Sequence, residues 1–227
     1  MSIIGLLVAI LMPSLSRARD QAKLISCMSN LHQVGMSILS YAHDQGVIPH
    51  GPDVQPLIPY LEANDGRLAT SQIWTGPQRP MKQRMALGLL LTRAVNVPEM
   101  MYCPGDDSND PVEELDKIAK QKISPAYSSY LYRQLQETDG HGRIEALGRN
   151  TAGGRATALA MDVNSLITVD PSFRRTNHKA VKVNVLYADG GVLAFDHRDG
   201  QFALRDQDLA DLAGRRGEIL RGVDARR

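Results

Sequence analysis

The sequence contains few of the residues on which nucleic-acid recognition depends. Its 227 residues carry a formal net charge of +1, and 5% of them are aromatic. A nucleic-acid-binding domain would need a clustered excess of Lys and Arg, and a single-strand binder would also need aromatic side chains on which bases stack. We therefore expect no nucleic acid among the partners of this chain.

Cysteine is scarce, and the common catalytic motifs are missing. The two cysteines, Cys27 and Cys103, cannot supply the four ligands of a zinc site, and their spacing fits no metal ribbon. The sequence has no zinc-protease helix motif, no nucleophile elbow and no phosphate-binding glycine loop. It therefore predicts a protein that is not an enzyme and that has no resident cofactor.

Long apolar runs are missing as well, apart from one short segment at residues 3–12 that ends before Pro13. Ten residues of helix cover roughly 15 Å, which is about half of a bilayer core. The segment also lacks the basic region and small-residue cleavage site of a secretory signal. It could be a buried helix of a soluble protein or part of a longer anchor. We favour the anchor, because the run begins without a cap or a polar stripe.

A second helical pattern follows Pro13. Apolar or small residues recur at alternating steps of four and three, which places them on one face of a helix. These residues are Leu24, Met28, Leu31, Gly35, Ile38 and Ala42. The pattern ends near Gly46, with Pro49 just beyond. We expect a helix over residues 14–45 that packs on a sheet, with a kink where Pro13 joins it to the apolar segment.

The rest of the sequence predicts an antiparallel sheet and therefore an α+β fold. Strand patterns cover residues 127–132, 157–161, 181–188 and 192–195, with Asp189-Gly190-Gly191 as a hairpin turn. No segment of helix length separates these strands, which favours antiparallel pairing. Residues 100–103 are expected to form a further short strand, and helices are expected within residues 81–95, 112–122 and 206–221.

These patterns divide the chain into three parts. Residues 1–46 form the N-terminal helix, with an apolar anchor at 2–13 and an amphipathic part at 14–46. Residues 47–200 form the globular head, and residues 201–227 form a polar extension whose last residues, 222–227, are expected to fray.

Four stretches of the sequence together carry a resemblance to a known family. They are residues 2–23 with Pro13 and Ser16-Arg17-Ala18-Arg19; residues 27–35 with Tyr41-Ala42-His43-Asp44; Gly88-Leu89-Leu90 with residues 102–106 and 129–133; and His178 with residues 184–192. In this order they resemble bacterial type IV pilin-like proteins, specifically the type II secretion pseudopilin-type proteins of planctomycete-like bacteria that end in an H-x9-D-G motif. The family motif corresponds here to His178, Asp189 and Gly190.

The resemblance implies a structural subunit with a pilin-like fold. Such a subunit would cross the inner membrane once through its N-terminal helix and hold its head in the periplasm or outside the cell. Its partners would be other pilin-like subunits and the secretion or pilus assembly machinery. Gly5 would permit close approach between helices. The anchor and assembly residues would be Ile3, Ile4, Gly5, Leu6, Leu7, Val8, Ile10, Leu11 and Pro13.

Two departures from the family pattern are visible. The basic leader, the peptidase site linked to N-terminal methylation and the acidic residue of the mature helix would all lie before Met1, so we expect the given sequence to begin within that helix. Residues 179–188 separate His178 from Asp189, one more than the usual nine. The additional residue predicts a bulge or a longer loop.

Several residues could bind a metal. His178, Asp189, Asp162 and His197 could form a metal or catalytic cluster, but we favour a turn role for Asp189 and a loop role for His178. The acidic loop that contains Asp106 and Asp110 resembles a calcium loop only loosely, because it lacks the central glycine and has Lys117 where a bidentate glutamate would close an EF-hand. Calcium therefore stays open as a ligand.

The two cysteines are candidates for a disulfide bond. Cys27 lies on the long helix and Cys103 ends an expected strand, so packing of the strand on the helix would bring them together. The extracytoplasmic head that the resemblance implies favours the bridge over two buried thiols. Two other functions stay open: an extracytoplasmic module that binds polysaccharide or calcium, and a soluble metal-dependent hydrolase that uses His178 and Asp189.

Overall fold

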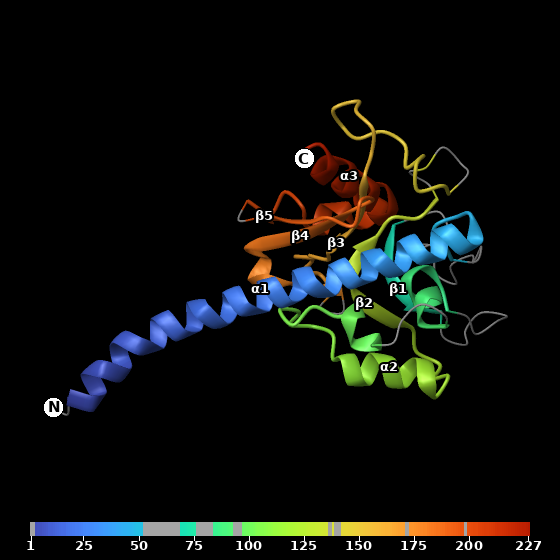
Figure 1. The fold of residues 1–227 in the computed structure, drawn as a ribbon. Coiled ribbons are helices and arrows are strands. Elements are labelled where there is room, and N and C mark those ends of the chain that lie inside the picture. The colour runs from blue at the N-terminus through green and yellow to red at the C-terminus, as the bar shows by residue number, and fades with distance from the viewer. Residues whose placement is uncertain are drawn as a thin grey trace.

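The computed structural model describes residues 3–51, 69–75, 84–92, 97–135, 138, 142–170, 173–197 and 199–227. Within them, one long helix lies across a five-stranded antiparallel sheet, and its N-terminal part extends beyond the head (Figure 1). The fold is therefore α+β, as the sequence predicts.

Helix α1 spans Ile3–Gln45 and joins the apolar and the amphipathic segments into one element. It stays continuous through Pro13 and curves along its N-terminal part (Figure 1). Gly46 ends the helix in a left-handed conformation, with φ of 74°, and its N–H donates to the Ala42 carbonyl. Among the described residues, no helix is both long and apolar enough to span a membrane.

The sheet is an antiparallel meander in which neighbours along the chain are neighbours in the sheet. Its strands are β1 (Thr70–Trp74), β2 (Ala126–Tyr132), β3 (Ala158–Asp162), β4 (Lys182–Tyr187) and β5 (Val192–Asp196). Gly190 has φ of 80° in the turn between β4 and β5, a conformation that glycine adopts without strain. The four strands predicted within residues 127–195 and the hairpin turn are confirmed.

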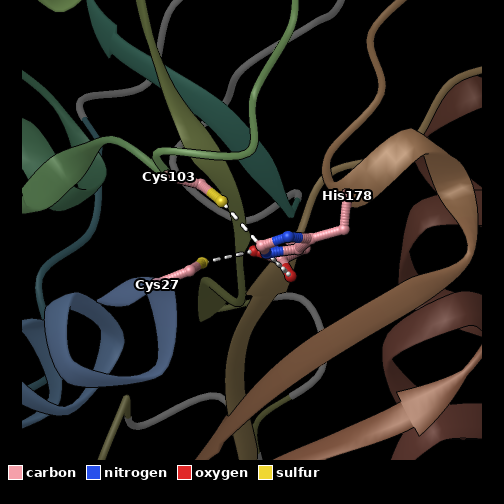
Figure 2. A group of neighbouring side chains, drawn as sticks. Cys27, Cys103 and His178 are labelled. Carbon is pink, nitrogen blue, oxygen red and sulfur yellow. Dashed lines mark hydrogen bonds and ion pairs between the residues drawn. The ribbon is translucent and has the colours of Figure 1, made fainter. Parts of the chain in front are cut away.

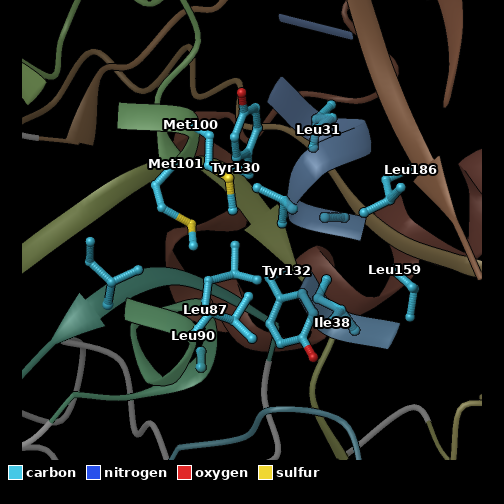
Figure 3. Close-up of a cluster of buried hydrophobic side chains, with 14 of the residues drawn as sticks. Leu31, Ile38, Leu87, Leu90, Met100, Met101, Tyr130, Tyr132, Leu159 and Leu186 are labelled. Atoms are coloured by element: carbon cyan, nitrogen blue, oxygen red, sulfur yellow. The ribbon is translucent and has the colours of Figure 1, made fainter. Parts of the chain in front are cut away.

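One face of the sheet packs against α1. The predicted apolar face of this helix is confirmed, because Leu31, Ile38 and Gly35 are buried and Cys27 and Val34 extend the same stripe. The core on this side also contains the aromatic and aliphatic side chains of β2, β3 and β4 (Figure 3). A Cβ atom on Gly35 would lie 2.6 Å from Leu186 Cδ1 of β4, so glycine allows the helix to approach the sheet closely.

The other face packs against the C-terminal segment. After the 3-10 helix η6 (Asp206–Asp211), helix α3 covers Leu212–Asp224 and contacts β3. Its Leu220 and Val223 are fully buried in a second core with Val183 and Val185 of β4. The expectation of a frayed end is therefore wrong for residues 222–224, which lie in α3, because the apolar side chains of this helix cover the second face of the sheet. Residues 225–227 follow the helix and are exposed.

Two further elements differ from expectation. Residues 98–101 form the 3-10 helix η2 (Pro98–Met101), not a strand, since proline at its start favours a helical turn, and Tyr102 follows it in an extended conformation. Within residues 81–95, the structure has a short 3-10 helix, η1 (Ala86–Thr92), while residues 81–83 and 93–95 lie outside the described ranges. Helix α2 (Pro111–Ala119) agrees with the prediction.

Candidate functional site

Four side chains with metal-binding atoms meet where α1 crosses the sheet. Cys27 comes from α1, Cys103 from the segment after η2, Asp162 from the end of β3, and His178 from the 3-10 turn η5 (His178–Ala180) (Figure 2). One ligand atom of each lies within 4.8 Å of all the others. Cys27, Cys103 and Asp162 are buried, and the His178 side chain is 6% exposed. We call these four residues the Cys2HisAsp cluster.

Short contacts connect the members of the cluster. The Cys27 thiol donates to Asp162 Oδ1 at 3.1 Å, and Cys103 Sγ lies 3.2 Å from His178 Nε2. His178 Nε2 also lies 3.5 Å from Asp162 Oδ2 and 3.3 Å from Asn184 Nδ2. Nε2 accepts from the thiol and the amide when the ring proton is on Nδ1, and it donates to Cys103 Sγ or Asp162 Oδ2 when the proton is on Nε2. In both tautomers the Nε2 atom points into the cluster.

Backbone donors act on two of the cluster's acidic groups. The Gly105 N–H donates to Cys103 Sγ at 3.2 Å, and the Asn184 N–H donates to Asp162 Oδ2 at 2.8 Å. The Asn184 N–H favours the ionised form of the Asp162 carboxyl group. The turn after Cys103 and strand β4 thus each supply a backbone donor to the cluster.

Burial shifts the ionisation of the cluster in the absence of a cation. It raises the pKa of Asp162 to about 7, against the opposing effect of the Asn184 N–H, and it raises the pKa of the Cys27 thiol well above its usual range. Burial, with a contribution from Lys23, lowers the pKa of His178 to about 4. The imidazole is therefore neutral at pH 7, and among the described residues no Lys or Arg forms an ion pair with the Asp162 carboxyl group.

The backbone holds His178 in an unusual conformation. His178, Lys179 and Ala180 have φ values of 50°, 56° and 53°, which is the left-handed region that side chains other than glycine rarely adopt. The His178 N–H donates to the Gly105 carbonyl at 3.0 Å. A Cβ on Gly105 would lie 2.5 Å from His178 Nδ1, so only glycine leaves room for the ring. Strain of this kind is concentrated at functional sites.

The structure brings together only part of the cluster considered from the sequence. Asp162 and His178 meet, but Asp189 lies at the far end of β4, where it pairs with Arg227 and accepts from the Gly191 N–H. His197 is buried beside Phe202, which donates its N–H to His197 Nδ1 at 3.3 Å. The motif residues His178 and Asp189 therefore do not form one site, and Gly190 belongs to the turn, where its carbonyl contacts His32.

The longer spacing between His178 and Asp189 corresponds to irregular backbone before β4. Strands β4 and β5 pair in a regular register, while the left-handed residues 178–180 precede β4. The additional residue thus fits a longer loop rather than a bulge in β4.

The two cysteines are free thiols, with sulfur atoms no more than 4.8 Å apart. The sequence prediction that they lie close together is confirmed, and a disulfide between them stays a prediction. Sequence reasoning overlooked that His178 and Asp162 join the same two thiols. One signal was available, because Asp162 ends a strand whose other residues are all apolar.

The acidic loop uses its carboxylates in hydrogen bonds. Asp106 accepts from Ser129 Oγ at 2.6 Å and from Asn109 Nδ2 at 2.7 Å. Asp110 is the N-cap of α2 and accepts from the Val112 N–H at 2.8 Å. These contacts give both residues a structural role, and calcium binding there stays a prediction.

Replacing Asp110 with alanine tests the role of that residue. We expect the free energy of unfolding to fall by about 1 kcal/mol, because the first turn of α2 loses its side-chain cap. Chemical denaturation with calcium and with a chelator measures the loss. An equal loss in both conditions is expected from a cap, whereas a loss seen only with calcium would favour a calcium ligand.

Comparison of the sequence with protein-family models, with curated proteins and with solved structures found no match in any of the three. Inference about function therefore rests on the residues and the structure of this chain.

Proposed function

We propose that this protein is a pilin-like structural subunit that associates through the N-terminal part of α1. One observation carries the proposal: a single helix has one half buried in the head and another half that projects from it with apolar side chains exposed (Figure 1). Ile10, Leu11 and Leu15 are 66%, 60% and 70% exposed. The side chains of Ile3, Ile4 and Leu6 lie outside the described part of the chain.

The exposed apolar half needs a covering environment. Leu7, Val8, Ile10, Leu11, Met12 and Leu15 leave a large apolar surface in contact with water. Patches of this kind mark sites of association with protein or membrane. Helix-to-helix packing against other copies, and insertion into the inner membrane, would both cover this surface, and Gly5 is exposed where close approach would occur.

The two proposed roles of the helix act together. Insertion into the inner membrane would place the head outside the cytoplasm, and lateral packing of the same helices would build a secretion-type pseudopilus or a pilus. The resemblance described above supports this combination. A hydrolase that uses His178 and Asp189 is not proposed, because β4 separates these residues.

Acidic substitutions in the projecting helix test the proposal. We expect the double variant Leu7→Asp and Leu11→Asp to move from the membrane fraction to the soluble fraction of cells that produce the protein. Each charge costs about 2.5–3.5 kcal/mol near the centre of a membrane helix. Fractionation and chemical crosslinking between copies provide the measurement.

The matched control places acidic residues on the head. Val112 and Ile123 are 78% and 68% exposed there, so Val112→Asp with Ile123→Asp adds the same charge without touching the helix. We expect this control to behave as the wild type. A wild-type protein that is soluble and shows no crosslinks between copies would reject the proposal.

A further inference from the structure

We propose that the Cys2HisAsp cluster binds one structural divalent cation of the zinc class, with Cys27, Cys103, Asp162 and His178 as its four ligands. The inference is independent of whether α1 assembles, because the site lies within the head. It assigns one common role to residues from four separate parts of the chain, which meet at this point.

The geometry of the cluster suits tetrahedral coordination. Bond lengths of about 2.0–2.3 Å to nitrogen, oxygen and sulfur place tetrahedral ligand atoms about 3.3–3.8 Å apart. One ligand atom of each residue lies within 4.8 Å of the other three, and two of the separations are 3.1 Å from Cys27 Sγ to Asp162 Oδ1 and 3.2 Å from Cys103 Sγ to His178 Nε2. Binding of an ion would therefore need side-chain shifts that bring the four atoms to the tetrahedral separations.

The types of ligand favour zinc over calcium or magnesium. Two sulfurs and one imidazole nitrogen are borderline-soft donors, which zinc prefers, whereas calcium and magnesium prefer sets of oxygen ligands. The Nε2 atom of His178 points into the cluster, as ligation requires. The Gly105 N–H bonded to Cys103 Sγ is the kind of outer contact that stabilises a metal-bound thiolate.

A cation would also remove an electrostatic problem. Asp162 is fully buried, and in the described part of the chain the one basic side chain within 4 Å of it is His178. Buried carboxylates are usually paired with a positive charge or bound to a metal ion. A divalent ion would be bound by the deprotonated carboxylate and thiolates, and it would supply the positive charge that balances them.

The burial of the cluster indicates a structural ion. A catalytic zinc keeps one position open for water or substrate, whereas a structural zinc is enclosed by four protein ligands. Here four protein ligands are available and enclosed. A cavity of about 310 Å³, lined in part by Leu24, Gly105 and His178, lies beside the cluster.

The position of the site defines what the ion would do. Leu24 and Cys27 are the first buried side chains that α1 presents as it enters the head. An ion bound to Cys27 would tie the helix to β3, to η5 and to the turn after η2 at the point where the helix leaves the head. Removal of the ion is therefore expected to loosen this junction first.

Metal analysis of the full chain tests the proposal. We expect protein purified in detergent with a non-chelating reductant to carry about one zinc per chain, as a four-ligand site requires. Cobalt(II) added to the metal-free protein should give the thiolate charge-transfer bands and the strong visible bands of a tetrahedral sulfur site. Zinc added at 100-fold over its dissociation constant should raise the melting temperature by about 5–10 °C.

Ligand variants and matched controls make the test specific. Cys27→Ser, Cys103→Ser, His178→Gln and Asp162→Asn should each lower zinc affinity by more than about 100-fold, because even outer-shell changes cost up to that amount. His32→Gln and Asp189→Asn change the same residue types outside the cluster and should bind as the wild type. Asp162→Asn preserves side-chain size, so its circular dichroism without metal shows that weaker binding does not come from misfolding.

Three results would overturn the proposal. The first is a reduced wild-type protein that binds no more zinc than the chelator-treated Cys27→Ser variant. The second is zinc binding that all four ligand variants retain. The third is a Cys27–Cys103 disulfide in the purified protein, shown by thiol titration, together with absence of zinc binding after reduction. That result would instead support the disulfide expected from the sequence.

Discussion

Replacing Asp224 with alanine is expected to lower the free energy of unfolding by about 3–5 kcal/mol, the range found when one member of a buried ion pair is removed. Asp224 Oδ2 lies 3.1 Å from Arg133 Nη2, and both side chains are fully buried. Asp224 Oδ1 also accepts from the N–H groups of Thr157 and Ala158 at 2.8 and 3.0 Å. The substitution would remove the carboxylate from a buried guanidinium and from two buried backbone donors.

Urea denaturation of the two proteins measures this effect. The control is Asp196→Ala, which removes a carboxylate that lies 3.2 Å from Lys182 and is 67% exposed. Surface ion pairs contribute little, so we expect a much smaller change from the control. Equal losses from the two substitutions would mean that the buried pair has no special role in stability.

Replacing Gly88 with alanine is expected to lower the free energy of unfolding by about 3 kcal/mol, at the upper end of the usual range for overpacking. Gly88 lies in η1, against the backbone of β1. A Cβ there would be 2.0 Å from the Ile73 carbonyl oxygen and 2.9 Å from its carbonyl carbon. Because backbone atoms cannot rotate away, η1 would have to move from β1 and disturb the packing of Leu87 and Leu90.

The matched control is the same substitution at Gly222 in α3. A Cβ at Gly222 would meet no atom within 4 Å, and alanine is favoured over glycine inside helices by about 0.5–1 kcal/mol. We therefore expect Gly222→Ala to stabilise the protein slightly, as measured by the midpoint of thermal unfolding. Destabilisation at both positions by the same amount would contradict the explanation based on space at Gly88.

Much of the fold follows from local patterns. The spacing of Leu24, Leu31 and Ile38 predicts the buried face of α1, and alternating or continuous apolar runs predict strands β2 to β5. Prediction from local patterns failed where a short apolar run is compatible with both a strand and a helical turn. Residues 100–103 are buried in a 3-10 turn and an extended segment, because burial alone does not distinguish a strand from a helical turn.

The C-terminal segment shows a different reason for failure. Residues 201–227 look polar, and only the presence of a second sheet face explains why Leu220 and Val223 are buried. From the sequence, Asp224 looks like a solvent-exposed charge near the C-terminus. In the structure it is buried and forms an ion pair with Arg133, which is far away in the sequence. Such long-range pairs are decided by the topology of the sheet.

The candidate metal site depends most strongly on topology. From the sequence, two cysteines were too few for zinc, and His178 was grouped with Asp189. Strand β4 carries these two motif residues apart, while the α1–sheet packing brings His178 and Asp162 to the cysteines. The sequence therefore showed each metal-binding side chain separately, but it did not show that Cys27, Cys103, Asp162 and His178 lie together.

The sequence by itself determined the class of the fold, the length and the buried face of the long helix, and the order of the main strands, because each follows from the periodicity of neighbouring residues. The tertiary structure alone decided which other distant residues meet: Arg133 with Asp224, Gly88 with the Ile73 backbone, and Asp162 and His178 with the two cysteines. Contacts between such residues depend on how helices and strands pack in space, and they cannot be read directly from the spacing of residues along the chain.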